Sequence, residues 1–168
     1  IGNQVTIGYF DQNSAQIQSE KTVLEHFHEL FPSMTEKDVR QTLGAYLFGG
    51  KDAAKKVSSL SGGEKSRLVL AELLQSRPNF LILDEHTAAL DPRTAEIVMK
   101  LTDQIVREKK MTTVMVTHNL RYALEYGDRI LMMHQGKIVL DKVGEEKNRL
   151  NTDEIMGIFN RISVECGN

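Results

Sequence analysis

Hydrophobic positions along the chain follow two alternating periods, which predicts strands interleaved with helices. An apolar segment over 5–10 and a β-branched segment over 112–118 are typical of strands. The continuous apolar run over 79–84 predicts a strand buried on both faces of a parallel sheet. We therefore expect an α/β fold with a mostly parallel sheet and a mostly helical insertion at about 20–76.

Helix starts are marked by capping residues. Thr22 and Glu25 have the spacing of a capping box for a helix that ends near residue 30, and Thr35 repeats the pattern for a helix that reaches about residue 47. Asp91 and Pro92 predict the start of a helix to about residue 110. Further predicted helices cover 119–126 and 152–162, and Thr152 caps the second of them. The remaining predicted elements are a loop at 48–59 and a hairpin that turns at Gln135-Gly136.

The composition is that of one ordinary globular domain of 168 residues with a net charge of −2. This charge gives no strong electrostatic hold on nucleic acid or an anionic membrane. A single cysteine, Cys166, excludes an internal disulfide and suits a reducing compartment, and no apolar run is long enough to insert into a membrane. The sequence begins almost inside a strand, so we expect a further segment upstream of residue 1.

The segment "LSGGEKSR" at 60–67 places two glycines in the first turn of a predicted helix. Ser61 and Glu64 form a capping box around them. Each glycine costs about 1 kcal/mol of helix propensity relative to alanine, but leaves backbone N–H groups open to an anion. The pattern therefore indicates a phosphate site at Gly62 and Gly63, and the alternative is a glycine-containing cap without a ligand.

Two acids, Asp84 and Glu85, follow the buried strand at 79–84. Ligands gather at the carboxyl ends of strands in open parallel sheets. One acid there can hold Mg²⁺ and the other can orient or deprotonate a water molecule. His118 follows the next strand and could contact a γ-phosphate. The alternatives are two acids that only end a strand, and a structural histidine.

Together these motifs resemble the ATP-binding-cassette (ABC) ATPase family, and the resemblance covers nearly the whole chain. It rests on Leu60-Ser61-Gly62-Gly63-Glu64, Asp84-Glu85, Ala89-Leu90-Asp91 and His118, in that order and spacing. The family implies a P-loop NTPase core at 1–19 and 77–168 and a helical signature subdomain at 20–76. It also implies ATP and Mg²⁺ as cofactors.

The resemblance assigns a role to each motif. Ser61, Gly62 and Gly63 would bind the γ-phosphate of ATP held by a partner cassette. Asp84 would be the Walker B magnesium acid and Glu85 the general base. The other assignments are Asp91 to the loop that couples the two ATP sites, His118 to the switch histidine, and Gln12 to the loop glutamine that senses Mg²⁺ and water.

The family's phosphate loop, G-x-x-x-x-G-K-[ST], should precede Gln12, and residues 1–11 do not contain it. The segment 45–52 is a poor substitute because it follows a helical pattern and Asp52 would repel phosphate. We therefore expect an incomplete cassette that is inactive by itself. It could be a fragment, a fold completed by another segment, or a rebuilt fold.

The two halves of the chain resemble different subfamilies. Residues 5–85 are similar to the ABC-F type, whose members act on ribosomes, and the segment from 85 onwards is similar to the ATPase subunit of a bacterial small-solute importer. A chimera joined near residue 85 accounts for both resemblances, and a divergent natural cassette is the alternative. An upstream phosphate loop that matches one subfamily on both sides of residue 85 would exclude the chimera.

The leading functional hypothesis is an ATPase domain that works as a dimer with a second ABC cassette and couples ATP hydrolysis to a membrane transport subunit. The family implies a cytoplasmic location, peripheral to the membrane. One alternative is a catalytically inactive module that lends its signature helix to the ATP of another cassette. The other is an ABC-F-like translation factor, the only reading in which nucleic acid would be a partner.

Overall fold

The computed structural model describes residues 4–11 and 16–165, with side chains to residue 161 at the carboxyl end. It divides into two compact units, 1–116 and 117–168, which are described separately below. The predicted division into a helical subdomain at 20–76 and a surrounding core stays a prediction.

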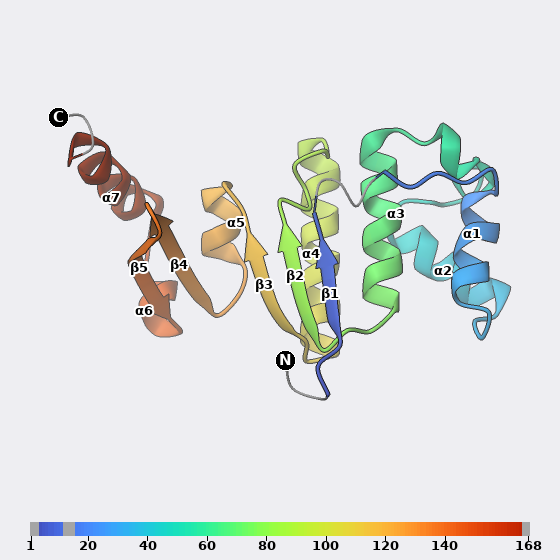
Figure 1. Cartoon of the computed structure of the whole chain (residues 1–168), viewed down its shortest axis with the longest axis horizontal. Helices are drawn as coiled ribbons and strands as arrows, with labels where there is room; N and C mark the ends of the chain where they lie inside the picture. The colour runs from blue at the N-terminus through green and yellow to red at the C-terminus, as the bar shows by residue number, and fades with distance from the viewer. Residues whose placement is uncertain (1–3, 12–15, 166–168) are drawn as a thin grey trace. The chain divides into compact units, whose positions relative to one another are not determined.

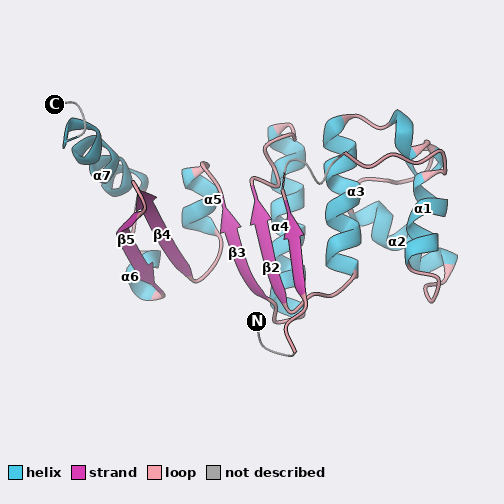
Figure 2. Cartoon of the chain, in the orientation of Figure 1, coloured by secondary structure: helices cyan, strands magenta, loops and turns pink. Residues whose placement is uncertain are grey.

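A three-stranded parallel sheet forms the centre of the first unit (Figures 1 and 2). Its strands are β1 (Ile7–Phe10), β2 (Phe80–Asp84) and β3 (Thr112–Val116), in the order β1-β2-β3. The register pairs Phe10 with Leu83 on one side of β2, and Asp84 with Val116 on the other. The structure thus confirms the predicted α/β fold and parallel sheet, with β1 and β3 two residues shorter than expected.

The central strand β2 is less completely buried than its sequence predicts. Leu81 and Leu83 are fully buried, whereas Phe80, Ile82 and Asp84 on the other face stay partly accessible. An unbroken apolar run therefore overstates the burial here, because only one face of β2 joins the hydrophobic core of the described unit.

Four helices of the first unit begin where their capping residues predict. They are α1 (Val23–Leu30), α2 (Glu36–Ala45), α3 (Gly62–Gln75) and α4 (Pro92–Glu108). The Thr22 side chain accepts from the Glu25 N–H, and the Glu25 carboxylate accepts from the Thr22 N–H. In Figure 1, α4 lies behind the sheet and α3 lies beside β1. Each helix thus starts at a side chain that satisfies its first amides.

The segment before α3 contains two short 3₁₀ turns, Asp52–Ala54 and Val57–Ser59, where the sequence predicts only loop. Backbone hydrogen bonds join this segment to the start of α1. The Val23 N–H donates to the Lys55 carbonyl at 2.9 Å, and the Val57 N–H donates to the Lys21 carbonyl at 3.0 Å. These bonds hold the entrance to α3 against the entrance to α1.

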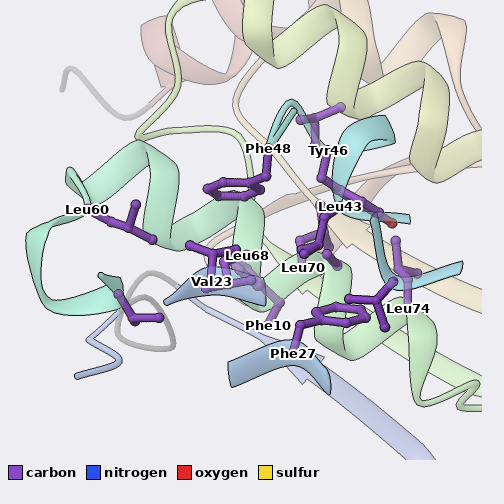
Figure 3. Close-up of a cluster of buried hydrophobic side chains, with 14 of the residues drawn as sticks. Phe10, Val23, Phe27, Leu43, Tyr46, Phe48, Leu60, Leu68, Leu70 and Leu74 are labelled. Carbon is purple, nitrogen blue, oxygen red and sulfur yellow. The ribbon is translucent and has the colours of Figure 1, made fainter. Parts of the chain in front are cut away.

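The hydrophobic core of the first unit lies mainly among α1, α2 and α3 (Figure 3) and reaches the sheet at Phe10, Leu81 and Leu83. Its largest fully buried side chains include Phe27 of α1, Leu43 of α2, and Leu68 and Leu70 of α3. Burial of each such side chain contributes about 1.5–3 kcal/mol. The helical segment and the sheet therefore share one core, which fixes the direction of α3.

The second unit contains a hairpin and three helices. These elements are α5 (Leu120–Glu125), β4 (Arg129–His134), β5 (Lys137–Val143), α6 (Glu145–Asn148) and α7 (Thr152–Glu165). Gln135 and Gly136 both have positive φ, as the predicted two-residue turn requires. The short α6 has no counterpart in the sequence prediction, and α7 is capped by Asn151, whose side chain accepts from the Glu154 N–H at 2.9 Å, rather than by Thr152.

None of the helices formed by the described residues is long and apolar enough to cross a membrane.

Candidate functional site

The amino end of α3 is built by a reciprocal cap. The Ser61 side chain accepts from the Glu64 N–H at 3.3 Å, and the Glu64 carboxylate accepts from the Ser61 N–H at 2.9 Å. This arrangement confirms the capping box predicted for "LSGGE". It satisfies the Glu64 amide from within the chain, and leaves the amides of Gly62 and Gly63 as the first-turn donors that no preceding helical carbonyl can reach.

A cluster of charges surrounds the Glu64 carboxylate. The Lys55 ammonium lies 2.9 Å from Glu64 and 2.8 Å from Asp52. Burial opposes the ionisation of Glu64, but the bonds from Lys55 and from the Ser61 N–H outweigh it and lower the pKa of Glu64 to about 2. The Glu64 carboxylate of the cap is therefore ionised at pH 7.

The two signature glycines have different surroundings. A Cβ on Gly63 would lie 3.0 Å from the Ala89 carbonyl oxygen and 3.4 Å from Leu90 Cδ2, whereas nothing lies within 4 Å of a Cβ on Gly62. Gly63 thus permits a close approach between α3 and the turn that follows β2. Close packing against Ala89 accounts for the glycine at position 63. At position 62, the absence of a neighbour leaves the first turn of α3 accessible to a ligand, which accounts for the glycine there.

The acids Asp84 and Glu85 lie at the carboxyl end of β2, where the sequence places them. Glu85 has a φ of 50°, and its N–H donates to the Val116 carbonyl at 3.1 Å. A side chain other than glycine, asparagine or aspartate rarely adopts this left-handed conformation, which costs about 1–2 kcal/mol. Residues held in such conformations cluster at functional sites.

An open cleft of about 430 Å³ lies between the amino end of α3 and the end of β2. The residues that line it are Phe10, Gln16, Gly62, Ser66, Glu85, His86, Ala88 and Ala89. The structure thus brings the predicted residues Gly62 and Glu85 into one cleft. Ser61, Gly63, Asp84 and Asp91 are near it in sequence but do not line it.

His86 is a member of this cleft that the sequence analysis missed. Its side chain is buried, and burial lowers its pKa to about 4, so that the ring is neutral at pH 7. The feature of the sequence that could have indicated His86 is its position directly after two acids at the end of a buried strand. The sequence alone could not show that the chain turns there and directs this residue into the interior.

The remaining predicted residues have separate outcomes. Asp91 caps α4, where its carboxylate accepts from the Thr94 N–H at 3.1 Å, and the Thr94 hydroxyl and amide lower the pKa of Asp91.

His118 is exposed and belongs to the second unit, so its approach to Glu85 stays a prediction. Gln12 lies outside the described residues. Within 4–11 and 16–165, no three acids, histidines or cysteines group as metal ligands.

We expect Gly63→Ala to be less stable than Gly62→Ala by about 1–3 kcal/mol, because only the Gly63 methyl meets a backbone oxygen. Gly62→Ala should be as stable as the parent or slightly more stable, since alanine favours the helix. Urea unfolding followed by circular dichroism measures both. Equal stability of the two variants would contradict the close approach between α3 and Ala89.

Glu64→Gln should lower the free energy of unfolding at pH 7 by about 1 kcal/mol. The pKa of Glu64 is lower in the folded than in the unfolded chain, so its stabilising effect is complete above its ordinary value of 4.5 and is lost as pH falls towards 2.

Parent and variant should therefore converge in stability over this pH range in urea titrations. Glu29→Gln, which removes a more exposed partner of Lys21, is the control and should have a smaller effect. A constant difference between parent and Glu64→Gln from pH 6 to pH 3 would show that Glu64 does not act through its charge.

A family model described as "ABC transporter" matches residues 3–88. The chain is 54% identical over 104 residues to a tyrosine transport ATP-binding protein of Clostridioides difficile, an overlap of 62% of this chain and 41% of that protein. It is 38% identical over 137 residues to the putative ATP-binding protein YdiF of Bacillus subtilis, covering 82% of this chain and 21% of that one. The chain thus spans less than half the length of these relatives.

The fold is also similar to that of solved cassettes. The structure of the ATP-binding cassette MJ0796 in a dimeric post-hydrolysis state, bound to ADP and Pi, superposes with a TM-score of 0.68 at 27% identity and covers 83% of this chain and 63% of that one. Fold, family model and relatives agree with one another. The chain belongs to the ABC transporter family.

Proposed function

We propose that this chain forms part of an ABC ATPase cassette that binds and hydrolyses Mg²⁺-ATP when it is complete and paired with a second cassette. The observation that carries the proposal is the pair Asp84-Glu85 at the carboxyl end of the central parallel strand, with Glu85 held in a left-handed backbone conformation. Hydrolysis would drive a conformational change in a membrane transport subunit.

The donor chemistry of this edge suits magnesium, because Mg²⁺ prefers carboxylate oxygens and Asp84 is a partly accessible carboxylate at the strand end. When bound, the ion would neutralise charge on the ATP phosphates. Glu85 would accept a hydrogen bond from the attacking water and orient it in line with the γ-phosphate.

The amino end of α3 would stabilise the phosphate that the partner cassette holds. Ser61 and the amides of Gly62 and Gly63 supply hydrogen-bond donors and the positive end of a 14-residue helix. Asp91 would couple the two ATP sites, His118 would contact the γ-phosphate, and Gln12 would sense Mg²⁺ and the attacking water.

The relatives support this reading through what their names state. One is a tyrosine transport ATP-binding protein, and another, 36% identical over 131 residues, is the energy-coupling factor transporter ATP-binding protein EcfA2 of Geobacillus kaustophilus. The MJ0796 cassette is dimeric and holds ADP and Pi. A second cassette and a membrane transport subunit are therefore the partners that we propose for this chain.

Glu85→Gln should reduce ATP turnover by about 10²–10⁴-fold while ATP affinity stays within twofold, because the amide cannot accept a proton but keeps the size and backbone of glutamate. The test uses a cassette completed by joining a phosphate-loop segment to this chain, with phosphate release and equilibrium ATP binding as readouts. Glu36→Gln, at an exposed position of α2, is the matched control. Full turnover by Glu85→Gln would end the assignment.

The exposed amino end of α3, at Ser61 and Gly62, also supports a second function, in which the chain lends α3 to ATP held by another cassette. This function predicts that the chain alone gives no turnover, and that turnover appears on mixing with a complete cassette whose own signature serine is replaced. Gly62→Arg, which fills the open approach to the first turn, should abolish this rescue. Rescue of equal size with Gly62→Arg would contradict it.

A further inference from the structure

The backbone of Glu85 is held by hydrogen bonds at both of its peptide groups. Its N–H donates to the Val116 carbonyl of β3 at 3.1 Å, and its carbonyl accepts from the Ala88 N–H at 2.9 Å. The second bond joins residues three positions apart and closes a β-turn that begins at Glu85. The two bonds therefore attach Glu85 to β3 and start the turn that leaves β2.

His86 is the second residue of this turn, and its ring packs against β1. The residue is 3% exposed, and its ring meets Phe10 edge-on, with centroids 6.4 Å apart and an interplanar angle of 84°. Aromatic rings in such contacts lie about 4.5–7 Å apart. Phe10 is the last residue of β1, is buried, and pairs in register with Leu83 of β2. The His86 ring therefore attaches the turn to β1, on the side of β2 opposite to β3.

Packing, rather than a hydrogen bond through Nε2, accounts for the orientation of the His86 ring. The Nε2 atom is inaccessible and has no hydrogen-bond partner. A buried polar atom without a partner lowers stability, so a phenylalanine that kept the same contact would make the fold more stable. The contact with Phe10 is therefore what we expect to fix the ring.

The left-handed conformation of Glu85 needs support of this kind. A glutamate at a φ of 50° is strained, and such strain persists only where the surroundings hold the residue in place. The backbone conformation sets the direction in which the side chain leaves the end of the strand, and Glu85 lines the cleft beside Gly62. If the turn could shift on its β1 side, Glu85 would relax towards a common conformation and its carboxylate would change direction.

We propose that His86 is a positioning residue, whose ring holds Glu85 in its left-handed conformation by packing against Phe10. The direction of the Glu85 carboxylate, and so its reach to an attacking water, depends on this contact. The proposal rests on the function proposed for Glu85, and it assigns His86 no contact with ATP or with water. A purely structural role would affect stability alone, and a role in the chemistry would need the ring nitrogen.

The first test measures amide hydrogen exchange in the ¹⁵N-labelled full chain by NMR. His86→Ala should raise the exchange rate of the Glu85 amide at least tenfold, because the turn can then open and break the bond to Val116. His86→Phe keeps the ring and should leave this rate within twofold of that of the parent.

Met111→Ala is the matched control. Met111 is 7% exposed and belongs to the same core, but it precedes the first residue of β3, at the end of the parallel sheet opposite to Glu85. The change should lower global stability through the cavity that it creates. Where the two variants have the same free energy of unfolding, the Glu85 amide should exchange at least tenfold faster in His86→Ala than in Met111→Ala.

The second test measures ATP turnover in a cassette completed with a phosphate-loop segment. His86→Ala should lower kcat about tenfold to hundredfold while KM for ATP stays within twofold, because a misdirected carboxylate slows the chemistry without affecting ATP binding. In a Glu85→Gln background the same change should lower turnover less than twofold further, since His86 acts through Glu85. His86→Phe should keep turnover within threefold of the parent and raise the thermal midpoint.

Three results would overturn the proposal. The first is an unchanged exchange rate of the Glu85 amide in His86→Ala. The second is an equal loss of turnover from His86→Ala in the parent and in the Glu85→Gln background. The third is a loss of turnover in His86→Phe as large as in His86→Ala, which would show that the ring nitrogen is required. If His86→Ala does not fold, His86→Val takes its place, and failure of both to fold would show a structural role.

The two proposals fail in different ways. If Glu85→Gln cassettes turn over normally while the exchange of the Glu85 amide still depends on the His86 ring, the ATPase role of Glu85 fails and the hold of His86 on its backbone stands. If Glu85→Gln loses turnover while His86→Ala keeps the kcat of the parent, the positioning role fails and the ATPase proposal stands.

Discussion

The close approach of Gly63 to the Ala89 carbonyl is the contact on which the geometry of the site depends. It lets the first turn of α3 lie against the turn that leaves β2. Any side chain at this position would move the two apart, because the opposing atom is a backbone oxygen held by its own turn. The cleft that contains Gly62, Glu85 and His86 lies beside this contact, between the amino end of α3 and the end of β2.

Hydrophobic packing of both α3 and β2 holds the two elements in position at this contact. Leu68 and Leu70 of α3 are buried in the core of the first unit, and Leu81 and Leu83 attach β2 to the same core. The Ser61–Glu64 cap, held ionised by Lys55, fixes where α3 begins. Burial of apolar side chains therefore sets the position of α3, and the charged cap sets the residue at which it begins.

Features that depend on a few neighbouring residues were predictable from the sequence. Capping at Thr22, Ser61 and Asp91 needs only a side chain and an amide three residues away, and these caps are present. The turn at Gln135-Gly136 is equally local. The apolar run at 79–84 predicts that Asp84 and Glu85 lie at a strand end, which the structure confirms.

Features that depend on distant segments were not predictable. The incomplete burial of β2 reflects what covers each face, and the sequence of the strand does not contain this information. Nothing in "SGG" distinguishes the packed Gly63 from the open Gly62, because Ala89 is 26 positions away along the chain. Lys55 falls in the predicted loop at 48–59, and its partner Glu64 lies beyond the 3₁₀ turn Val57–Ser59, in the first turn of α3.

The backbone hydrogen bonds between the entrance to α1 and the segment before α3 have a mechanical consequence. They form a short brace, in which Lys21 and Val23 hold Val57 and Lys55. Only a few residues separate these bonds from Ser61, so we expect a displacement of α1 to move the first turn of α3 with it.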